Sequence, residues 1–367
     1  MKDFDRVRWT VMSADPLVSA RERFRWRQRL GWGPPFVPYS AEQRYDPGAV
    51  LDGARSVLTV AVPYWHPMKR QGQAVTSRSS WGADYHDVVQ GLVRDVLDRL
   101  VGKEAASRAH IQADSGPLEE RALAVESGLG YLGSNGSIFV PPFGSWVFLG
   151  AAVTDVPINP STGHSQSTAD SGCLQCSKCV NACPTGALFA PHRINHHRCL
   201  SYLTQRRGFL AVSLRRSFQG RLFGCDNCQE ACPANGEAER GVVAFAPDEL
   251  DRNCDPLSIL QMSQSEFDVT WGAKSAGWRG RRTLRRNAIL ALANTDEREL
   301  VTLLAQHLCD PSPIIRGHIA WAMSEIATRV GERLPRDLRG RLADLFACDD
   351  DPRVRFEAQR ALEDRIQ

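Results

Sequence analysis

Two closely spaced runs of cysteine constrain this chain more than any other feature. The first run, with the spacing C-x2-C-x2-C-x3-C-P, consists of Cys173, Cys176, Cys179 and Cys183. The second, with the spacing C-x2-C-x3-C-P, consists of Cys225, Cys228 and Cys232. Eight of the eleven cysteines fall between residues 173 and 232, whereas a secreted disulfide framework usually spreads an even number through a small fold. The crowding therefore favours metal binding in a reducing compartment.

The spacing within the runs is that of bacterial proteins that hold two 4Fe-4S clusters. In these proteins three close thiolates bind one cluster, and the cysteine before the proline crosses to the other cluster. Paired C-x2-C motifs also bind zinc, but zinc explains neither the third regularly spaced cysteine nor the Cys-Pro endings. We therefore expect a bacterial ferredoxin-like double-cluster domain. Its first cluster is expected to have the ligands Cys173, Cys176, Cys179 and Cys232.

The same pattern leaves the second cluster one ligand short. Three of its thiolates are expected to come from Cys183, Cys225 and Cys228. Cys199 lies between the two runs, where the chain has to fold back on itself, so it is favoured over Cys254 as the fourth ligand. Cys254, Cys309 and Cys348 are expected to be small apolar packing residues.

The segment before the cysteine runs is predicted to be a mixed α/β domain. RSVLTVAVPYW is rich in β-branched residues and predicts a strand, whereas DYHDVVQGLVRDVLDRLV has the apolar spacing of an amphipathic helix. GSIFVPPFGSWVFLGAAVTD predicts two strands around a Pro-Gly turn. The Pro-, Gly- and Ser-rich stretch DVPINPSTGHSQSTADSG predicts a domain boundary.

A repeated helical pattern follows the second cysteine run. RRNAILALA, DPSPIIRGHIAWAMSEIA and DPRVRFEAQRALEDRI each set an arginine ahead of small and apolar residues at helical spacing, and Asp-Pro introduces the last two. Their separation of about 30 to 40 residues indicates HEAT-like hairpins that stack to share a core. We therefore expect an α/β domain at 1–160, a ferredoxin-like domain at 161–240 and an all-α HEAT-like domain at 241–367.

Composition is that of an ordinary globular protein, with 43% hydrophobic and 24% charged residues. The net charge of +3 permits a nucleic-acid partner but does not indicate one unless basic residues are concentrated locally. The N-terminus has no apolar core of the signal-peptide type, and no window approaches the roughly 18 apolar residues of a membrane span. A cytoplasmic location without membrane association is expected.

From about residue 44 onward the chain resembles the epoxyqueuosine reductase family. The resemblance is carried by ADSGPLEERALAVESGLGYLGSNGSIFVPPFGSWVFLG, by SSWGADYHDVV, by RCLSYLTQRRGFL, by the two cysteine runs in this order, and by WRGRRTLRRNAILALA. The related cobalamin-dependent reductive dehalogenases share the core and the two clusters, but they are typically exported. This chain shows no export signal and carries a helical repeat instead.

The resemblance implies an enzyme that reduces epoxyqueuosine to queuosine at the wobble position of tRNA, the last step of queuosine biosynthesis. It implies a cobalamin in the α/β domain and two 4Fe-4S clusters that pass single electrons to its cobalt. The implied partners are the anticodon stem-loop of a queuosine-type tRNA and an unidentified low-potential electron donor, with the chain a monomer. The family's fourth ligand of the second cluster falls on Cys199, in agreement with the spacing.

The resemblance assigns the role of proton donor to Asp114 in ADSGPLEE. A carboxylic acid whose pKa is raised by burial can hand a proton to the epoxide oxygen as the ring opens. From the residues alone, Asp-Ser-Gly-Pro ahead of LEERALAVESG is also a good helix start, with Asp114 as its N-cap.

Further cobalamin contacts implied by the resemblance, beside Asp114, are Arg44, Ser77, Ile138, Leu149, Ser201 and Asp226. The glycines of SGLGYLGSNGS are expected to let the backbone approach a large flat ligand. Two positions depart from the family pattern, since Ser134 replaces a usual lysine and Ala151 a common acid. DYHDVV begins like an Asp-x-His-x-x-Gly cobalamin motif, but Val89 replaces the glycine. His86 is therefore expected at a helix N-terminus lining the site rather than on cobalt.

Local clusters of arginine support an RNA partner. WRGRRTLRRN sets arginines beside Trp278, and QRRGFL adds two more near the cysteine runs. Clustered arginines neutralise phosphates and stack on unpaired bases, although solvated helix faces carry similar runs. The predicted tRNA contacts are Arg206, Arg207, Arg281, Arg282, Arg285 and Arg286.

Two other functions stay open from the sequence. The same cofactors could reduce a small molecule, in the manner of a reductive dehalogenase, or the chain could be a ferredoxin-like electron carrier on a helical scaffold. Tight binding of cobalamin would exclude the carrier, and conversion of epoxyqueuosine-containing tRNA would exclude the small-molecule reductase.

Overall fold

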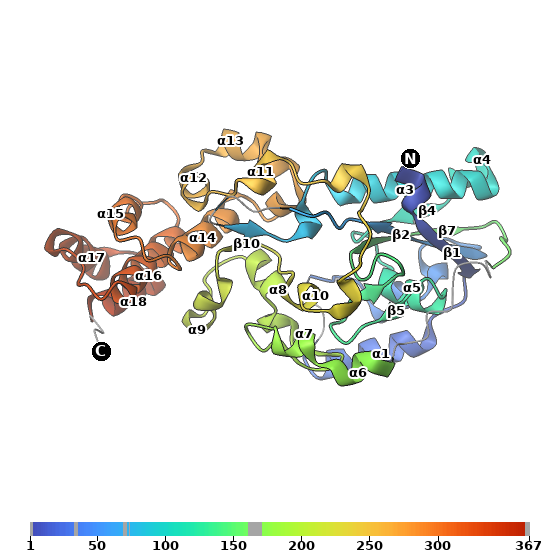
Figure 1. Ribbon diagram of the computed structural model, residues 1–367, viewed down its shortest axis with the longest axis horizontal. Coiled ribbons are helices and arrows are strands. Elements are labelled where there is room, and N and C mark those ends of the chain that lie inside the picture. Colours follow the sequence, from blue (N-terminus) through green and yellow to red (C-terminus); the bar gives the residue numbers. More distant parts are fainter. Residues whose placement is uncertain (1–2, 33–35, 69–71, 73, 161–170, 364–367) are drawn as a thin grey trace. The chain divides into compact units, whose positions relative to one another are not determined.

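The structure is a computed structural model that describes residues 3–32, 36–68, 72, 74–160 and 171–363 (Figure 1). The chain divides into two compact units. The first comprises Met1–Met68, Arg78–Cys199 and Asp226–Asp248, and the second comprises Lys69–Ser77, Leu200–Cys225 and Glu249–Gln367. Most of the predicted connector, residues 161–170, lies outside the described residues. The three-domain boundaries stay a prediction from the sequence.

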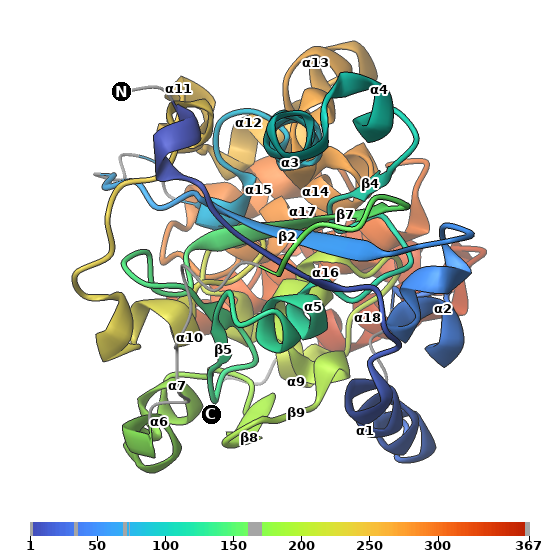
Figure 2. The same ribbon diagram turned by 90° about the vertical axis from the view of Figure 1, so that its right-hand side faces the viewer.

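An antiparallel four-stranded sheet forms the centre of the first unit. Its order is β1 (Arg8–Ser13), β2 (Ser56–Pro63), β7 (Val147–Thr154) and β4 (His110–Gln112). Helix α3 (Tyr85–Val101) covers one face and α5 (Glu120–Glu126) the other (Figure 2). All eight residues of β2 are buried because this strand is central and covered on both faces. The predicted strand in RSVLTVAVPYW is confirmed.

Helix α3 confirms the predicted amphipathic helix. Its N-cap residue, Asp84, accepts a hydrogen bond from the His86 N–H group at 2.9 Å. Its apolar face packs closely on β7, because a Cβ atom at Gly150 would lie 2.7 Å from both Val89 and Val93. The two strands predicted around the Pro-Gly turn are β6 (Ile138–Phe139) and β7, but β6 pairs with β5 (Tyr131–Leu132) rather than with β7.

The rest of the first unit consists of short elements. Its other helices are α1 (Val18–Arg29), α2 (Ala41–Tyr45), α4 (Lys103–Ala106), α6 (Ser171–Cys176), α7 (Lys178–Asn181) and α10 (Asn227–Glu230). A hairpin is formed by β8 (Leu188–Ala190) and β9 (Arg193–Ile194). Of these, α6, α7 and α10 carry predicted cluster ligands on helices of only one or two turns, with loops between them.

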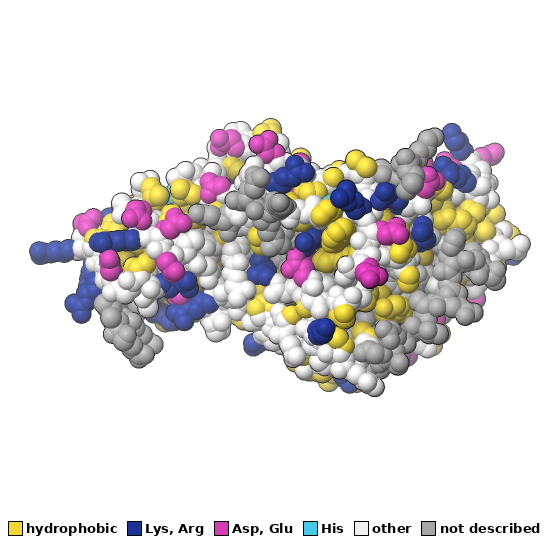
Figure 3. Space-filling model, viewed as in Figure 1, with side chains coloured by type: hydrophobic (Ala, Val, Ile, Leu, Met, Phe, Trp, Pro, Cys, Tyr) yellow, Lys and Arg dark blue, Asp and Glu magenta, His cyan; other side chains and the backbone are white. Residues whose placement is uncertain are grey.

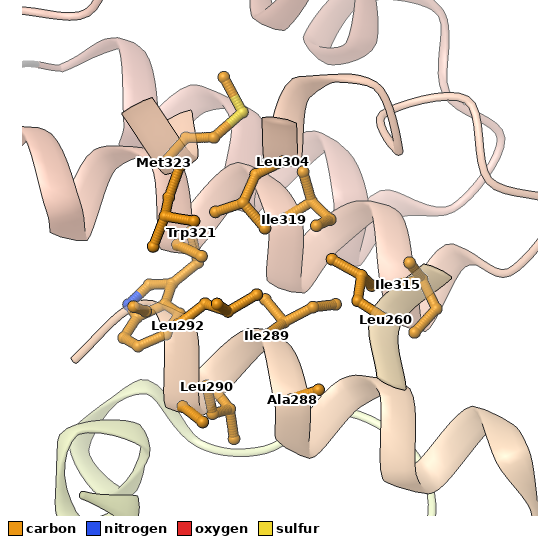
Figure 4. Packing of buried hydrophobic residues seen from close by; sticks show 14 of the residues in the cluster. Leu260, Ala288, Ile289, Leu290, Leu292, Leu304, Ile315, Ile319, Trp321 and Met323 are labelled. Carbon is orange, nitrogen blue, oxygen red and sulfur yellow. The ribbon is translucent and has the colours of Figure 1, made fainter. Parts of the chain in front are cut away.

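The second unit is almost entirely helical. Its helices are α8 (Leu200–Gln205), α9 (Val212–Arg215), α11 (Glu249–Arg252), α12 (Pro256–Gln261), α13 (Gln264–Val269), α14 (Arg281–Leu292), α15 (Glu299–Ala305), α16 (Pro313–Arg329), α17 (Arg336–Cys348) and α18 (Pro352–Leu362). Its strands β3 (Val75–Thr76) and β10 (Arg221–Phe223) form a short parallel pair. Helices α14 to α18 confirm the HEAT-like repeat, and Figure 4 shows Ile289 and Leu292 of α14 facing Ile319 and Trp321 of α16.

Helix starts in the repeat follow the predicted Asp-Pro signals in only one case. Helix α18 begins at Pro352, with Asp351 as its N-cap residue. Helix α16 begins at Pro313 instead of at the preceding Asp-Pro pair. The Asp310 carboxylate does not cap α16, because it accepts a hydrogen bond from Ser312 N–H at 2.8 Å and pairs with Arg285.

The arginines of the repeat form a structural ladder. Arg285 of α14 pairs with Asp310 at 2.8 Å. Arg316 of α16 binds Asp349 through two bonds of 2.6 and 2.8 Å, and it also donates to the Asp310 carbonyl at 2.7 Å. Each arginine thus ties its helix to the turn that precedes the next helix of the stack. A planar guanidinium suits this bidentate contact.

The three cysteines outside the ligand pattern differ in their surroundings. Cys254 is buried in the core of the second unit, where its thiol donates to the Leu250 carbonyl at 3.3 Å. Cys309 and Cys348 are exposed, so the prediction that they are packing residues is wrong. Cys309 follows the end of α15, and Cys348 is the last residue of α17, beyond its buried Leu338 and Leu342.

No helix among the described residues is long and apolar enough to cross a membrane.

Replacing Arg316 by alanine should destabilise the helical unit. The change leaves the buried Asp349 carboxylate without its bidentate partner, a loss of roughly 1–3 kcal/mol in the free energy of unfolding. Thermal unfolding followed by circular dichroism measures the effect. Arg298→Ala is the matched control, because Arg298 and Glu332 are both exposed and such pairs contribute little. Equal melting temperatures for the two variants would contradict the ladder.

Candidate functional site

Asp114 lies in the loop that connects β4 to α5. Its backbone is left-handed, with a φ angle of 58°, a conformation that aspartate accepts more readily than most residues. Glu120 holds it there, because its Oε1 atom accepts a hydrogen bond from Asp114 N–H at 2.9 Å. Gln112 closes the loop at its base through bonds of 3.1 and 2.9 Å to the N–H and C=O groups of Leu118. The loop leaves 71% of the Asp114 side chain exposed.

The interpretation of Asp114 as a helix N-cap is wrong. Helix α5 begins at Glu120, and its N-cap residue is Glu119. The Asp-Ser-Gly-Pro sequence instead forms the tight loop, in which a Cβ atom at Gly116 would fall 2.2 Å from the Gln112 side chain. Glycine is therefore required by close packing at this point of the loop.

The first two residues of α3 face the Asp114 carboxylate. The Tyr85 hydroxyl donates a hydrogen bond of 2.7 Å to Asp114 Oδ2. His86 Nε2 lies 3.8 Å from the same oxygen, and His86 Nδ1 lies 2.7 Å from Asp84 Oδ1. The prediction that His86 belongs to a helix N-terminus is confirmed. Tyr85 was not singled out from the sequence, where nothing in DYHDVV separates it from an ordinary first-turn residue.

These contacts decide where a proton resides. The Asp114 carboxylate, assisted by Asp84, raises the pKa of His86 to about 9 although partial burial opposes the shift. In return, His86 and then Tyr85 lower the pKa of Asp114 below its ordinary value. The expectation that the pKa of Asp114 is raised is therefore wrong, because the hydrogen bonds to His86 and Tyr85 outweigh the opposing effect of burial. At neutral pH the proton is on the imidazole beside the carboxylate.

Glu120 is a second acid that the sequence did not indicate. Burial raises its pKa to about 7, and its Oε1 atom also accepts a hydrogen bond from the Gln112 amide. Its neighbour Glu119 is different, because Arg121 and Arg44 outweigh burial and lower the pKa of Glu119 to about 2. Adjacent glutamates thus acquire opposite properties from the partners that the fold supplies.

Two other predicted cobalamin contacts, Arg44 and Asp226, are buried in the first unit. Arg44 is buried in α2 and forms an ion pair with Glu119, but its Nε atom has no hydrogen-bond partner among the described residues. Asp226 is buried, and its Oδ2 atom accepts a hydrogen bond of 2.8 Å from Arg78 N–H. Arg44 therefore keeps a donor for a ligand, whereas Asp226 is already engaged.

The structure brings together some of the remaining predicted contacts. Ile138 of β6 and Leu149 of β7 belong to one apolar cluster beneath α5. Ser77 and Ser201 belong to the second unit, where Ser77 N–H donates to the Phe223 carbonyl at 2.8 Å and Ser201 lies in α8. These serines and the aliphatic pair stay predictions as cobalamin contacts.

Two glycines of SGLGYLGSNGS have close neighbours. A Cβ atom at Gly130 would lie 2.5 Å from the Phe139 carbonyl, and one at Gly133 would lie 2.3 Å from the Phe139 ring. At these two positions the close neighbours belong to the β5–β6 hairpin itself, and the expected approach of the backbone to a flat ligand stays a prediction. These glycines serve the fold of the hairpin.

The thiols assigned to the first cluster lie within electrostatic range of one another. Burial, followed by Cys173 and Cys232, raises the pKa of Cys179. Burial, followed by Cys173 and Cys176, raises the pKa of Cys232. All eleven cysteines are free thiols. No three Cys, His, Asp or Glu residues in the described part of the chain are arranged to ligate a single metal ion.

Hydrogen bonds connect the loops that carry ligands assigned to the second cluster. The Cys183 sulfur accepts from Leu188 N–H at 3.5 Å, and with Thr185 this outweighs burial and lowers the pKa of Cys183. Arg198, the residue before Cys199, donates to the Thr185 carbonyl at 2.7 Å. The chain around Cys199 is therefore tied to the loop that follows Cys183.

The two departures from the family pattern have structural explanations. Ser134 is buried, its N–H group donates to the Cys173 sulfur at 3.3 Å, and its hydroxyl lies 3.3 Å from the same sulfur. Ala151 is fully buried in β7 and packs in a core with Val57 and Leu123. Ser134 thus contacts a predicted cluster ligand, and Ala151 serves the sheet.

Two of the predicted RNA-binding arginines are structural. Arg286 is fully buried and donates to the carbonyls of Leu203, Thr204 and Arg206. Arg285 is buried against Asp310 and the Leu260 carbonyl. Both also line a cavity beside the N-terminus of α14, so their role as tRNA contacts stays a prediction. Both point into the stack at helical positions that the sequence did not distinguish from exposed ones.

The other four arginines lie at or near the surface of the second unit. Arg206, Arg207 and Arg282 are exposed, whereas Arg281 is half-buried and donates to the Met262 carbonyl at 2.7 Å. A cavity of about 540 Å³ beside the N-terminus of α14 is lined by Arg207, Arg281 and Arg282. Basic side chains also gather over α17 and α18, at the left of Figure 3.

Comparison with known proteins identifies three segments of the chain. Residues 44–115 match the family described as epoxyqueuosine reductase QueG. Residues 172–235 match the 4Fe-4S double cluster binding domain, and residues 280–363 match HEAT repeats. The epoxyqueuosine reductase of Bacillus anthracis is 33% identical over 364 residues, which cover 96% of this chain and 92% of that protein. That of Bacillus subtilis is 35% identical, over 88% of this chain and 84% of that protein.

The chain belongs to the epoxyqueuosine reductase family. Solved structures of the family agree with this assignment. An epoxyqueuosine reductase with an epoxyqueuosine-modified tRNA-Tyr stem loop superposes with a TM-score of 0.86 and 30% identity over 97% of this chain and 94% of that one. The Bacillus subtilis enzyme, with its catalytic loop swung out of the active site, has a TM-score of 0.86 and 32% identity over the same shares. The chain is accordingly an oxidoreductase with a 4Fe-4S double cluster domain.

Removal of Cys199 should halve the iron content. Cys199→Ala should leave about one 4Fe-4S cluster per chain, because three thiolates hold the second cluster poorly. Cys254→Ala, a change in the apolar core, should leave the iron content unchanged. Iron and sulfide analysis after anaerobic reconstitution measures both. If only Cys254→Ala loses iron, the fourth ligand of the second cluster is Cys254 and not Cys199.

Ser134→Ala should lower the reduction potential of the first cluster. Hydrogen bonds to cluster sulfurs favour the reduced state. The change removes a hydroxyl that accepts from the Cys173 thiol at 3.3 Å and that can donate to the same sulfur once it is a thiolate on the cluster. A lost hydrogen bond corresponds to roughly 20–60 mV. Redox titration followed by electron paramagnetic resonance measures it, with Ser137→Ala on the same hairpin as the control. A higher potential in Ser134→Ala would contradict the assignment of Cys173.

Proposed function

We propose that this chain reduces the epoxide of epoxyqueuosine in tRNA to give queuosine, with the oxygen released as water. The reaction consumes two electrons and two protons. The observation that carries the proposal is the His86–Asp114 pair, which places a protonated imidazole and an exposed carboxylate side by side within the matched segment 44–115. Membership of the family and the double cluster domain supply the context.

Cobalamin is the cofactor that the family implies, and the residues of the first unit suit it. Arg44 has a buried Nε atom that lacks a partner among the described residues and could donate to the cofactor. We assign the contacts to Arg44, Asp114, Ile138 and Leu149, with Ser77, Ser201 and Asp226 as further candidates. When bound, cobalamin would supply a reducible cobalt that delivers electrons to the epoxide.

Electrons are proposed to arrive one at a time through the two clusters. The first has the assigned ligands Cys173, Cys176, Cys179 and Cys232, and the second has Cys183, Cys199, Cys225 and Cys228. Four thiolates on each cluster leave no open position for a substrate, so the clusters transfer electrons only. The reductant that feeds them, the monomeric state and the cytoplasmic location stay predictions from the sequence.

Proton delivery is the part of the reaction that the described residues explain. As the epoxide opens, charge develops on its oxygen, and a positioned acid lowers the barrier. Asp114 is exposed and can face the substrate, while His86 holds the proton next to it. We infer that Asp114 passes the proton on and that His86 recharges it, with Tyr85 fixing the carboxylate through its 2.7 Å bond.

The RNA partner is proposed to contact the second unit. A family member has been solved with a modified tRNA-Tyr stem loop. The exposed Arg206, Arg207 and Arg282, with Arg281, are the candidates for phosphate contact. No observation favours a halogenated small molecule or a simple electron carrier.

The test is conversion of the modified nucleoside. The purified chain, reconstituted anaerobically with iron, sulfide and cobalamin and supplied with a strong reductant, should convert epoxyqueuosine in tRNA to queuosine. Nucleoside analysis by mass spectrometry detects the product. Reduction of a halogenated organic compound without conversion of the tRNA would overturn the proposal.

Asp114→Asn should abolish turnover, with a fall of about 100-fold or more, because an amide cannot relay the proton. Cobalamin binding and iron content should be unchanged. Asp87→Asn, on the exposed side of the first turn of α3, is the matched control and should keep the parent rate. If Asp114→Asn keeps the parent activity, Asp114 has a structural role and is not the proton donor.

The rate of the chemical step should fall as the pH rises through about 9. Below this value His86 carries its proton, and above it the imidazole is neutral and cannot recharge Asp114. Single-turnover rates between pH 6 and 10 measure the profile. His86→Gln should remove the decline near 9 and lower the plateau, whereas an unchanged profile would exclude His86.

A further inference from the structure

A second cavity lies in the first unit, beside α1 and the β8–β9 hairpin. Its volume is about 170 Å³. Its aromatic and basic walls include Phe24, Trp26, Trp32, Arg27, His192 and Arg193. Small-molecule sites usually measure roughly 300–1,000 Å³, so this cavity suits one part of a larger ligand, or a small one.

The aromatic wall is held in place by its neighbours. The rings of Trp26 and Trp32 meet edge to face at 6.2 Å and 88°, and Trp32 meets Phe189 in the same way at 5.8 Å. His196 Nδ1 lies 3.2 Å from the Trp32 carbonyl. The guanidinium of Arg193 lies 5.0 Å from the centre of the Trp26 ring. Flat apolar surfaces next to a cation are therefore formed before any ligand binds.

The side chains that line the cavity carry more positive than negative charge. Among the described residues, Glu119 is the one carboxylate that lines the cavity, and it is paired with Arg44 and with Arg121, the latter at 2.6 Å. Burial and the neighbouring Arg121 lower the pKa of Arg27, which forms no ion pair with any described residue. The Nδ1 atom of His192 is buried without a hydrogen-bond partner in the described part of the chain.

We propose that this cavity binds a heterocyclic nucleotide, with the base against Trp26 and Trp32 and the phosphate at Arg27 and His192. Stacking on aromatic rings and charge-assisted bonds to arginine are the two interactions that such a group needs. The buried Nδ1 atom of His192 and the Arg27 guanidinium then both gain a partner. Two sources offer this chemistry within the proposed function, namely the nucleotide loop of cobalamin and an unpaired nucleotide of the tRNA.

Arg27→Ala tests the proposal, and Arg29→Ala is its control. Arg29 is exposed on the same helix and does not line the cavity. Binding of cobalamin, of cobinamide, which lacks the nucleotide loop, and of the unmodified tRNA stem-loop is measured by titration with the cluster-loaded chain. Loss of one charge-assisted phosphate contact should weaken binding about 10- to 100-fold.

If the nucleotide loop is the ligand, Arg27→Ala should weaken cobalamin and leave cobinamide and RNA unchanged. If a tRNA nucleotide is the ligand, only RNA should be weakened. Unchanged binding of all three would overturn the proposal, and because no turnover is measured, that result is distinct from failure of the reductase function. Arg27→Lys, which keeps the charge without the planar fork, replaces Arg27→Ala if the latter does not fold.

Discussion

The candidate active site depends on one constraint, the left-handed backbone of Asp114 beside the first turn of α3. A non-glycine residue in this conformation costs on the order of 1–3 kcal/mol and persists only where the surroundings hold it. Glu120, Gln112 and Tyr85 supply those surroundings from three different elements. The loop thereby brings its carboxylate to His86, and each group shifts the pKa of the other away from its ordinary value.

Buried arginines in the second unit make bonds that hold its chain segments in place. Arg286 has no carboxylate partner among the described residues, and desolvation lowers its pKa to about 9. Its guanidinium is nevertheless satisfied by backbone carbonyls of the chain that leads to Arg206 and Arg207. Removing a buried cation's partners is costly, so this network fixes the position of that chain. Arg285, in contrast, is neutralised by Asp310. Arg286 thus supports the segment that carries the two exposed arginines.

Local patterns allowed much of the fold to be predicted. The β-branched run of β2, the amphipathic spacing of α3 and the recurring apolar stretches of α14 to α18 were all visible, because each depends on neighbours close in sequence. The wrong predictions concern positions whose structure depends on residues distant in sequence. Asp310 does not start α16 because Arg285 pairs with it, and Asp114 does not cap α5 because Glu120 and Tyr85 bind it within a loop. No sequence pattern records such contacts.

The sequence by itself determined the chemistry available to this protein. Cysteine spacing indicated two 4Fe-4S clusters, and the motif around Asp114 led to the epoxyqueuosine reductase family, since ligand number and residue type are properties of the chain. Only the tertiary structure decided which groups carry charge. His86 holds a proton and Glu119 loses one, while Glu120 beside it titrates near neutrality. The physical reason is that a pKa depends on solvent exposure and on nearby charges, which residues distant in sequence supply.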